Sequence, residues 1–148
     1  MSVLVYTENW DGKFKKLSRE LVSYASAVAA MAGGSVTALS IGEVSPDELA
    51  VLGAHGASKV LNASSCKGAL DNQLFTQIIA AAMEKTGSRI LIMANNNTGK
   101  ALAPRLSVRL KAGLVSGVTA LPESVSPVTV RKKVFSGKAF SLVAVNTD

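Results

Sequence analysis

Two carboxylates, Glu8 and Asp11, follow the first apolar run of the chain closely enough to share one loop. Such a pair can work as general acid and general base when burial moves the two pKa values apart. The intervening Trp10-Asp11-Gly12 sequence is typical of a tight turn at the surface, which seldom buries a carboxylate. We therefore expect no acid–base catalysis from this pair.

Cys66 is the only cysteine of the chain and His55 the only histidine. A single cysteine excludes an internal disulfide and fits a reducing compartment. A Cys–His pair can serve as nucleophile and base, but no catalytic signature surrounds either residue. So few sulfur and nitrogen ligands also argue against a zinc site. We expect no catalytic residue and no metal site.

The segment Asn95-Asn96-Asn97-Thr98-Gly99-Lys100 has some features of an anion site, because small polar residues, a glycine and a lysine precede a predicted helix. It lacks a P-loop, since Ala94 and Ala101 occupy the positions of the first glycine and of the Ser or Thr. Glu8 would repel a phosphate across the predicted crevice. We therefore expect a crevice that is empty or degraded. Its weak candidate residues are Glu8, Asn97, Thr98, Gly99, Lys100 and Arg105.

The net charge of +6 comes from 16 basic and 10 acidic residues, and much of the basic charge lies in two patches. Aromatic residues make up only 5% of the chain, and no nucleic-acid-binding motif is present. No segment approaches the roughly 20 apolar residues of a membrane helix. We expect no nucleic acid, no membrane insertion and, without a visible signal or transit peptide, a cytoplasmic location if the protein is prokaryotic. The patches comprise Lys13, Lys15, Lys16 and Arg19, then Arg131, Lys132, Lys133 and Lys138.

Strand-like apolar runs alternate with helical patterns through the first 119 residues. Ser45-Pro46-Asp47-Glu48 predicts a helix start with a capping box, and Ser18 is the predicted cap of an earlier helix. A third helix is predicted over Asp71–Thr86, with Leu74, Ile78, Ile79 and Ala82 on its apolar face. Leu102–Leu110 predicts a fourth, with a kink or restart at Pro104. The predicted strands are Val3–Tyr6, Val36–Ile41, Lys59–Asn62, Ile90–Ala94 and Leu114–Thr119.

This alternation predicts an α/β fold of three layers around a mostly parallel sheet. With the strand order 3-2-1-4-5, a ligand crevice would lie between the first and fourth strands. Val128–Phe135 and Ala139–Val145, separated by Ser136-Gly137-Lys138, predict an antiparallel C-terminal hairpin that extends the sheet at its edge. We expect residues 1–148 to form a single domain.

Several segments, taken in order, resemble the N-terminal domain of electron-transfer flavoprotein alpha subunits. The opening Val3–Glu8 run is similar to the start of that family, and Gly53–Val60 is similar to its second helix-to-strand passage. Thr98–Ser107 resembles its Gly-Lys-x-x-x-Pro-Arg helix, and Arg131–Ala139 resembles its Arg-x-x-tyrosine-x-Gly-x-Ala hairpin. Gly117 departs from the acidic residue of many relatives.

The resemblance covers essentially all of the chain and implies an adenine-nucleotide hydrolase-like fold. It implies that residues 1–148 are the N-terminal part of a longer alpha subunit whose FAD-binding C-terminal domain is absent from this chain. The chain would then be a non-catalytic scaffold that packs on the beta subunit beneath the FAD domain, with the hairpin and the basic surface as candidates for subunit contact. We expect no cofactor bound to this chain alone.

The complete heterodimer would pass electrons through FAD from dehydrogenases, such as the acyl-CoA dehydrogenases of fatty acid beta-oxidation, to a quinone oxidoreductase. The alternative is a free-standing nucleotide-binding protein of the universal-stress type, which would use the segment from Asn95 to Lys100 to hold phosphates.

Overall fold

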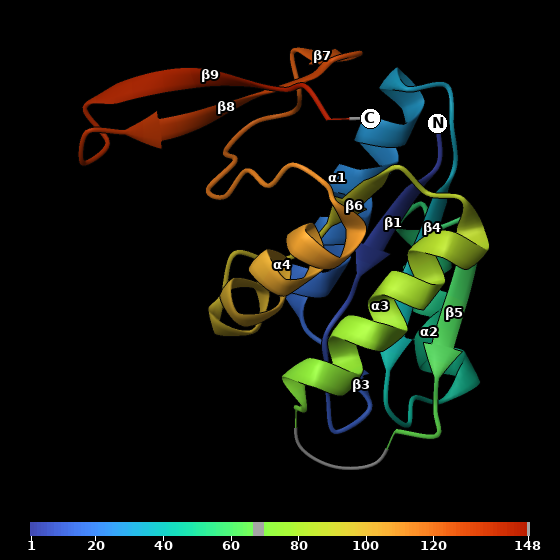
Figure 1. Ribbon diagram of the computed structural model, residues 1–148. Helices are drawn as coiled ribbons and strands as arrows, with labels where there is room; N and C mark the ends of the chain where they lie inside the picture. Colours follow the sequence, from blue (N-terminus) through green and yellow to red (C-terminus); the bar gives the residue numbers. More distant parts are fainter. Residues whose placement is uncertain (67–69, 148) are drawn as a thin grey trace. The chain divides into compact units, whose positions relative to one another are not determined.

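The computed structural model (Figure 1) describes residues 1–66 and 70–147. Close contacts divide the chain into two compact units, Met1–Ala94 and Asn95–Asp148. In the part of the chain that the structure describes, no helix is both long and apolar enough to span a membrane.

A four-stranded parallel sheet forms the centre of the first unit, in the order β5-β4-β1-β6. Counted along the chain, this is the predicted order 3-2-1-4. The two central strands are continuous apolar or small-residue runs that are buried along their whole length, as expected for strands covered on both faces. The strands are β1 (Val3–Tyr6), β4 (Val36–Ile41), β5 (Lys59–Ala63) and β6 (Ile90–Ile92).

Helices cover both faces of this sheet, which confirms the predicted three-layer α/β fold. In Figure 1, α1 and α2 lie behind the sheet and α3 lies in front of it. The main apolar cluster joins β1 and β4 to α1 and to Leu52 of α2. On α3, Ile79, Ala80, Ala82 and Met83 are buried. The helices are α1 (Lys16–Met31), α2 (Pro46–Ala54) and α3 (Asn72–Thr86).

Three local predictions in this unit are wrong or incomplete. Ser18 does not cap α1, because the helix begins before it and Lys15 is the cap residue. Ser18 is instead buried, and its hydroxyl donates a hydrogen bond to the carbonyl of Glu8 at 2.6 Å. The fourth strand ends at Ile92 rather than at Ala94, and Leu74 is exposed rather than part of the apolar face of α3.

The second unit contains one helix and a separate three-stranded antiparallel sheet in the order β7-β8-β9. The predicted hairpin is confirmed, but in the described part of the chain it belongs to this separate sheet rather than extending the parallel sheet at its edge. The predicted fifth strand at Leu114–Thr119 is wrong, because only Val118 pairs, through an isolated antiparallel bridge to Lys132. The elements are α4 (Asn97–Leu110), β7 (Ser124–Val125), β8 (Val128–Val134) and β9 (Ala139–Val145).

Helix α4 begins at Asn97 rather than at the predicted Leu102, and it continues through Pro104 without the predicted restart. Its start is fixed by Asn96, whose side chain accepts a hydrogen bond from the amide of Gly99 at 2.9 Å. After the helix, the amide of Gly113 donates to the hydroxyl of Thr147 at 3.0 Å. The segment after α4 is thereby tied to the end of the hairpin.

Candidate functional site

The loop that leaves β1 is held to the end of β4 by its own polar side chains. The amide and the hydroxyl of Thr7 both donate to the carbonyl of Leu39, at 2.9 and 3.0 Å. The side-chain amide nitrogen of Asn9, Nδ2, donates to the hydroxyl of Ser40 at 3.1 Å and to the backbone carbonyl of Ile41 at 2.7 Å. These donors, at the carboxyl end of the sheet where a ligand of an α/β protein would bind, are used inside the protein.

The chain from Asn9 to Phe14 folds into a small hairpin of β2 (Asn9–Trp10) and β3 (Lys13–Phe14). Its two turn residues, Asp11 and Gly12, both have positive φ angles, 48° and 75°, as in a type I′ turn. A side chain on Gly12 would place its Cβ 2.9 Å from the carbonyl oxygen of Glu43. Glycine therefore allows the turn to approach the connection between β4 and α2.

Glu48 ties this small hairpin to the start of α2. Ser45 caps the helix as predicted, accepting from the amide of Glu48 at 3.3 Å. The Glu48 carboxylate does not complete the capping box. It accepts from the amide of Phe14 at 2.8 Å and meets the ammonium of Lys13 at 3.4 Å. The hydrogen bond from Phe14, followed by the one from Lys13, holds the pKa of Glu48 below its ordinary value.

The predicted carboxylate pair is split between two environments. Glu8 is half-buried and Asp11, in the turn, is exposed. Burial, and secondly the negative charge of Glu8, raise the pKa of the Tyr6 phenol. The Tyr6 phenol is therefore neutral at physiological pH and no ready source of a phenolate.

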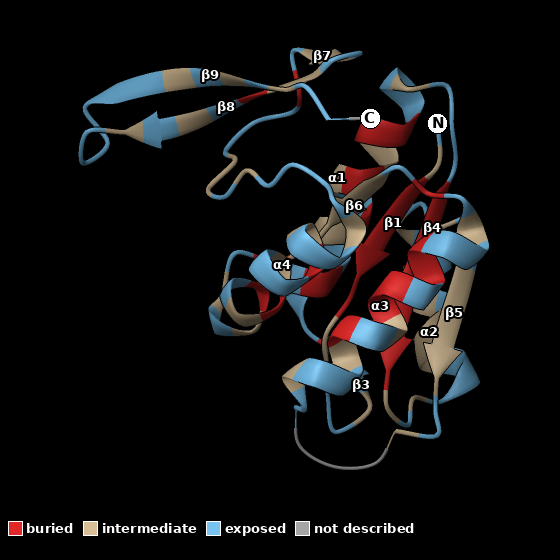
Figure 2. Ribbon diagram, viewed as in Figure 1, coloured by how far each residue is buried: buried red, intermediate tan, exposed pale blue. Residues whose placement is uncertain are grey.

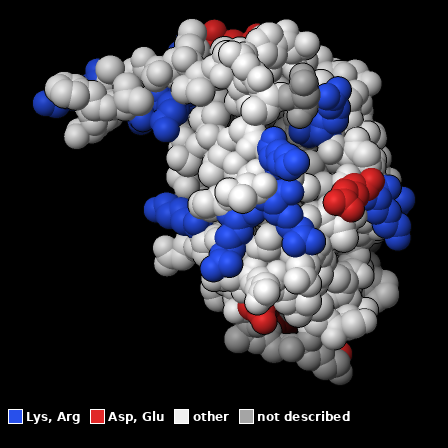
Figure 3. Space-filling view, viewed as in Figure 1, with Lys and Arg blue, Asp and Glu red and all other residues white. Residues whose placement is uncertain are grey.

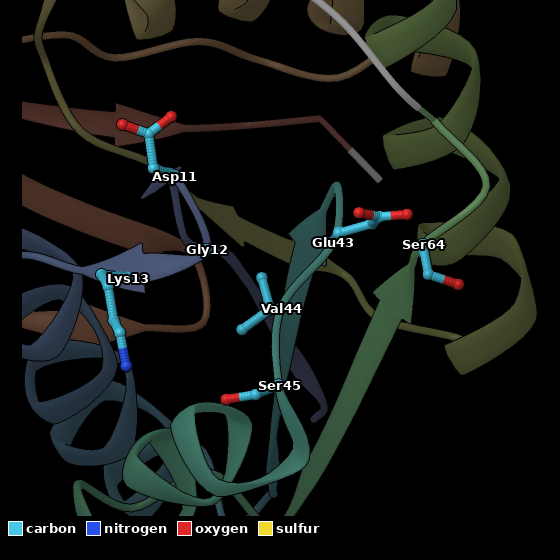
Figure 4. A pocket seen from close by; sticks show the side chains of 7 residues that line it. All are labelled: Asp11, Gly12, Lys13, Glu43, Val44, Ser45 and Ser64. Atoms are coloured by element: carbon cyan, nitrogen blue, oxygen red, sulfur yellow. The ribbon is translucent and has the colours of Figure 1, made fainter.

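A shallow depression of about 450 Å³ lies beside the small hairpin (Figure 4). Asp11 and Glu43 contribute carboxylates to it, and the one cation among its described lining residues, Lys13, is paired with Glu48. A dinucleotide diphosphate needs convergent amides or cations. The depression therefore does not fit FAD. Its lining residues are Asp11, Gly12, Lys13, Glu43, Val44, Ser45 and Ser64.

The switch point of the sheet lies between β1 and β6, as predicted, because the chain runs from β1 outward through β4 to β5 and then returns to the other side of β1. Of the candidate residues, Glu8 belongs to the first unit and the others to α4 in the second. That they form one crevice stays a prediction. Within α4, Gly99 is buried and Thr98 half-buried, whereas the side chains of Asn97, Lys100 and Arg105 are exposed.

Cys66 and His55 lie beyond opposite ends of β5, so the structure does not bring them together. Five strand residues separate their segments by roughly 16 Å. The Nδ1 atom of His55 lies 2.9 Å from the carbonyl oxygen of Val51, within its own helix end. Among the described residues there is also no group of three or more potential metal ligands from His, Cys, Asp and Glu.

Both basic patches contain paired charges. In the first patch, Lys13 and Lys16 form ion pairs with glutamates, and the Lys15 ammonium lies 4.1 Å from the centre of the Trp10 ring.

In the second patch, Arg131 forms an ion pair with Glu123 at 2.9 Å. Arg131 and Lys133 are exposed on β8 beside two exposed apolar residues, Phe140 and Leu142, on β9. Sequence reasoning missed this arrangement. Alternation along β9 places Phe140 and Leu142 on one face. The sequence alone does not give the register of the hairpin, and the register decides which residues of β8 lie beside them.

Comparison with known proteins decides the family. The model of the electron transfer flavoprotein domain matches residues 3–148. The chain belongs to this family. The electron transfer flavoprotein domain thus extends over both compact units, which confirms the resemblance derived from the sequence. Proteins of the family are electron carriers rather than enzymes, in agreement with the expectation for this chain.

Two relatives are named as alpha subunits of electron transfer flavoproteins. The one from Bacillus subtilis is 28% identical over 147 residues, covering 99% of this chain and 44% of the relative. The one from Clostridium acetobutylicum is 30% identical over 127 residues, covering 80% of this chain and 36% of the relative. Protein FixB of Clostridium saccharobutylicum is 27% identical over 96% of the chain and 43% of its own length. The chain spans less than half the length of these relatives.

Proposed function

We propose that this chain is the N-terminal scaffold domain of an electron-transfer flavoprotein alpha subunit, and that it packs on a beta subunit beneath an FAD-carrying domain. The observation that carries the proposal is the family match over residues 3–148, together with relatives named as alpha subunits. In this proposal, the FAD domain would correspond to the share of these relatives that the chain leaves uncovered.

The contacts at the carboxyl end of the parallel sheet support a scaffold role. Thr7 and Asn9 use their polar side-chain atoms to join β1 to β4, and Glu48 fixes the small hairpin. A platform requires rigidity of this kind. FAD, when bound by the complete protein, would supply one- and two-electron redox chemistry, and the residues of this chain would hold the subunits in place.

In the complete protein, electrons would pass from dehydrogenases, such as acyl-CoA dehydrogenases, through FAD to a quinone oxidoreductase. This chain would contribute no redox group to that path.

The proposal is tested by purifying the chain alone and together with a beta subunit of the same organism. We expect a stable complex on size-exclusion chromatography, and protein without the absorbance of flavin near 450 nm when the chain is purified alone. Flavin recovered in equimolar amount with the isolated chain would contradict the scaffold role. Titration with ATP and AMP is the second arm, because tight binding by the chain alone would favour the universal-stress alternative.

A further inference from the structure

The exposed face of the β8–β9 hairpin is unusual for a two-stranded ribbon. A hairpin with one covered face normally presents polar side chains on the other. Here Phe140 and Leu142 point to the same face as the cations Arg131 and Lys133, because the register pairs Lys133 with Phe140 and Arg131 with Leu142. We call these four residues the hairpin face.

The apolar members of the hairpin face remain open to solvent. The exposed fraction is 57% for Phe140 and 56% for Leu142. On the opposite face, Val130 is buried, and Val128, Val134, Val143 and Val145 are half-buried. Figure 2 shows the outer part of both strands mostly exposed, with burial confined to one end of β8. Folding of this chain therefore accounts for one face of the hairpin and leaves the other without cover.

The hairpin face is also held in shape. The Arg131 guanidinium lies 5.6 Å from the centre of the Phe140 ring and donates to the carboxylate of Glu123 at 2.9 Å. A ring and a guanidinium that are already placed lose little conformational entropy when a partner binds. Aromatic and arginine side chains are also the residues that most often dominate the energy of protein interfaces.

The charge of the hairpin indicates what would bind there. Residues 123–147 contain four basic residues and one acidic residue, Glu123, whose carboxylate pairs with Arg131. Figure 3 shows Lys and Arg side chains on the hairpin and over α4, with few acidic side chains among them. A second copy of this chain would bring like charges together, which is unfavourable. An apolar patch framed by carboxylates would match both the apolar centre and the basic flanks.

We propose that the hairpin face is a docking surface for a protein partner that presents an apolar patch bordered by acidic residues. The inference rests on the proposed function, in which that partner is the beta subunit. Single-stranded nucleic acid is a poorer match, because the hairpin face has one aromatic ring and an aliphatic residue beside it rather than a row of stacking rings.

The test measures binding of the complete 148-residue chain to the beta subunit by calorimetry. We expect the double variant Phe140→Ser/Leu142→Ser to bind at least about tenfold more weakly than the original chain. The matched control is Val108→Ser on α4. Val108 is an apolar residue that is 80% exposed and does not belong to the hairpin face, so we expect this variant to bind as the original chain does. Far-UV circular dichroism and the urea midpoint of each variant show that the fold is retained.

A second variant tests the charge. Arg131→Gln/Lys133→Gln should weaken binding at low salt and flatten the dependence of affinity on salt concentration. Equal binding by the original chain and both double variants would overturn the docking surface but leave the proposed function standing. Failure of the original chain to bind any beta subunit would overturn both. Binding of a single-stranded oligonucleotide that is lost in Phe140→Ser/Leu142→Ser would also overturn the protein assignment.

Discussion

Residues 1–94 and residues 95–148 distribute their apolar and charged side chains differently. Among the described residues, 19 buried apolar residues lie in the first unit and three in the second, whereas the large exposed apolar residues divide six to six. The first unit has eight basic and eight acidic residues, and the second has eight basic and two acidic. The whole net charge of +6 therefore belongs to the shorter unit.

The difference separates a unit built around its own core from a shorter unit with few buried apolar residues. Burial of apolar area is the main stabilising contribution to folding, and the first unit contains most of it. The second unit exposes as many large apolar side chains as the first in a shorter length of chain.

The largest effect is expected for truncation of a buried leucine. Leu52 is fully buried in the main apolar cluster, so Leu52→Ala should lower the free energy of unfolding by about 2–5 kcal/mol. Leu142→Ala, at a 56% exposed site in the second unit, should change it by less than about 0.5 kcal/mol. Urea denaturation followed by far-UV circular dichroism measures both. Similar midpoints for the two variants would remove the distinction between the units.

A smaller effect is expected from glycine replacements in the two turns. Gly12→Ala imposes a left-handed conformation on alanine and a contact of 2.9 Å with the carbonyl of Glu43, costing about 2–3 kcal/mol. Gly137 in the β8–β9 turn also has a positive φ, 82°, but nothing lies within 4 Å of an added Cβ. Gly137→Ala should cost only about 1 kcal/mol. Thermal or urea midpoints compare them, and a larger loss for Gly137→Ala would contradict the packed turn.

Acidification should act on the first unit through Glu48. The pKa of the Glu48 carboxyl is lowered in the folded protein from its unfolded value of 4.5. The contribution of Glu48 to the stability of the fold is therefore complete above pH 4.5 and is lost as pH falls through the lower pKa of the folded state. Glu48→Gln should therefore lower the urea midpoint at neutral pH and lose less stability between about pH 5 and pH 3 than the original chain.

The control for Glu48→Gln is Glu123→Gln in the second unit. Its ion pair with Arg131 is exposed on both sides, and removing it should change stability by about 0–1 kcal/mol. Parallel pH profiles for the original chain and Glu48→Gln would show that the contact with Phe14 does not stabilise the fold.

The smallest effect is expected at Trp10. Removing the cation beside its ring by Lys15→Ala should cost about 0.5 kcal/mol or less, because the site is exposed. Trp10 is the only tryptophan, so its fluorescence reports on the surroundings of this ring. We expect a changed emission intensity in Lys15→Ala. An unchanged emission would contradict the contact between the Lys15 ammonium and the Trp10 ring.

The elements that the sequence predicts well are those decided by local pattern. β1 and β4 are uninterrupted buried runs, and the Ser45-Pro46 start of α2 satisfies its own helix end. Ser18 lies inside α1, and its hydroxyl donates to the backbone carbonyl of Glu8, ten residues earlier in the chain, rather than capping the helix. Leu114–Thr119 has the composition of a strand, but composition does not provide a neighbouring strand to pair with.

The candidate site was less predictable for the same reason. The sequence predicts the fourth helix over Leu102–Leu110, whereas α4 begins at Asn97 and is capped by Asn96. The hydrogen bond from the Phe14 amide to the Glu48 carboxylate joins residues 34 positions apart, and only the folded chain reveals it. The hairpin face likewise depends on the register of β8 against β9, because a shift of one residue would turn every side chain to the other face.

The concentration of positive charge in residues 95–148 has a consequence for the rate at which partners meet. Attraction of an acidic protein begins beyond contact, over a Debye length of about 8 Å at physiological ionic strength. The neutral first unit adds little to that pull. Diffusional encounters would therefore be steered toward the second unit, so that approaching partners arrive already oriented before any side chain touches them.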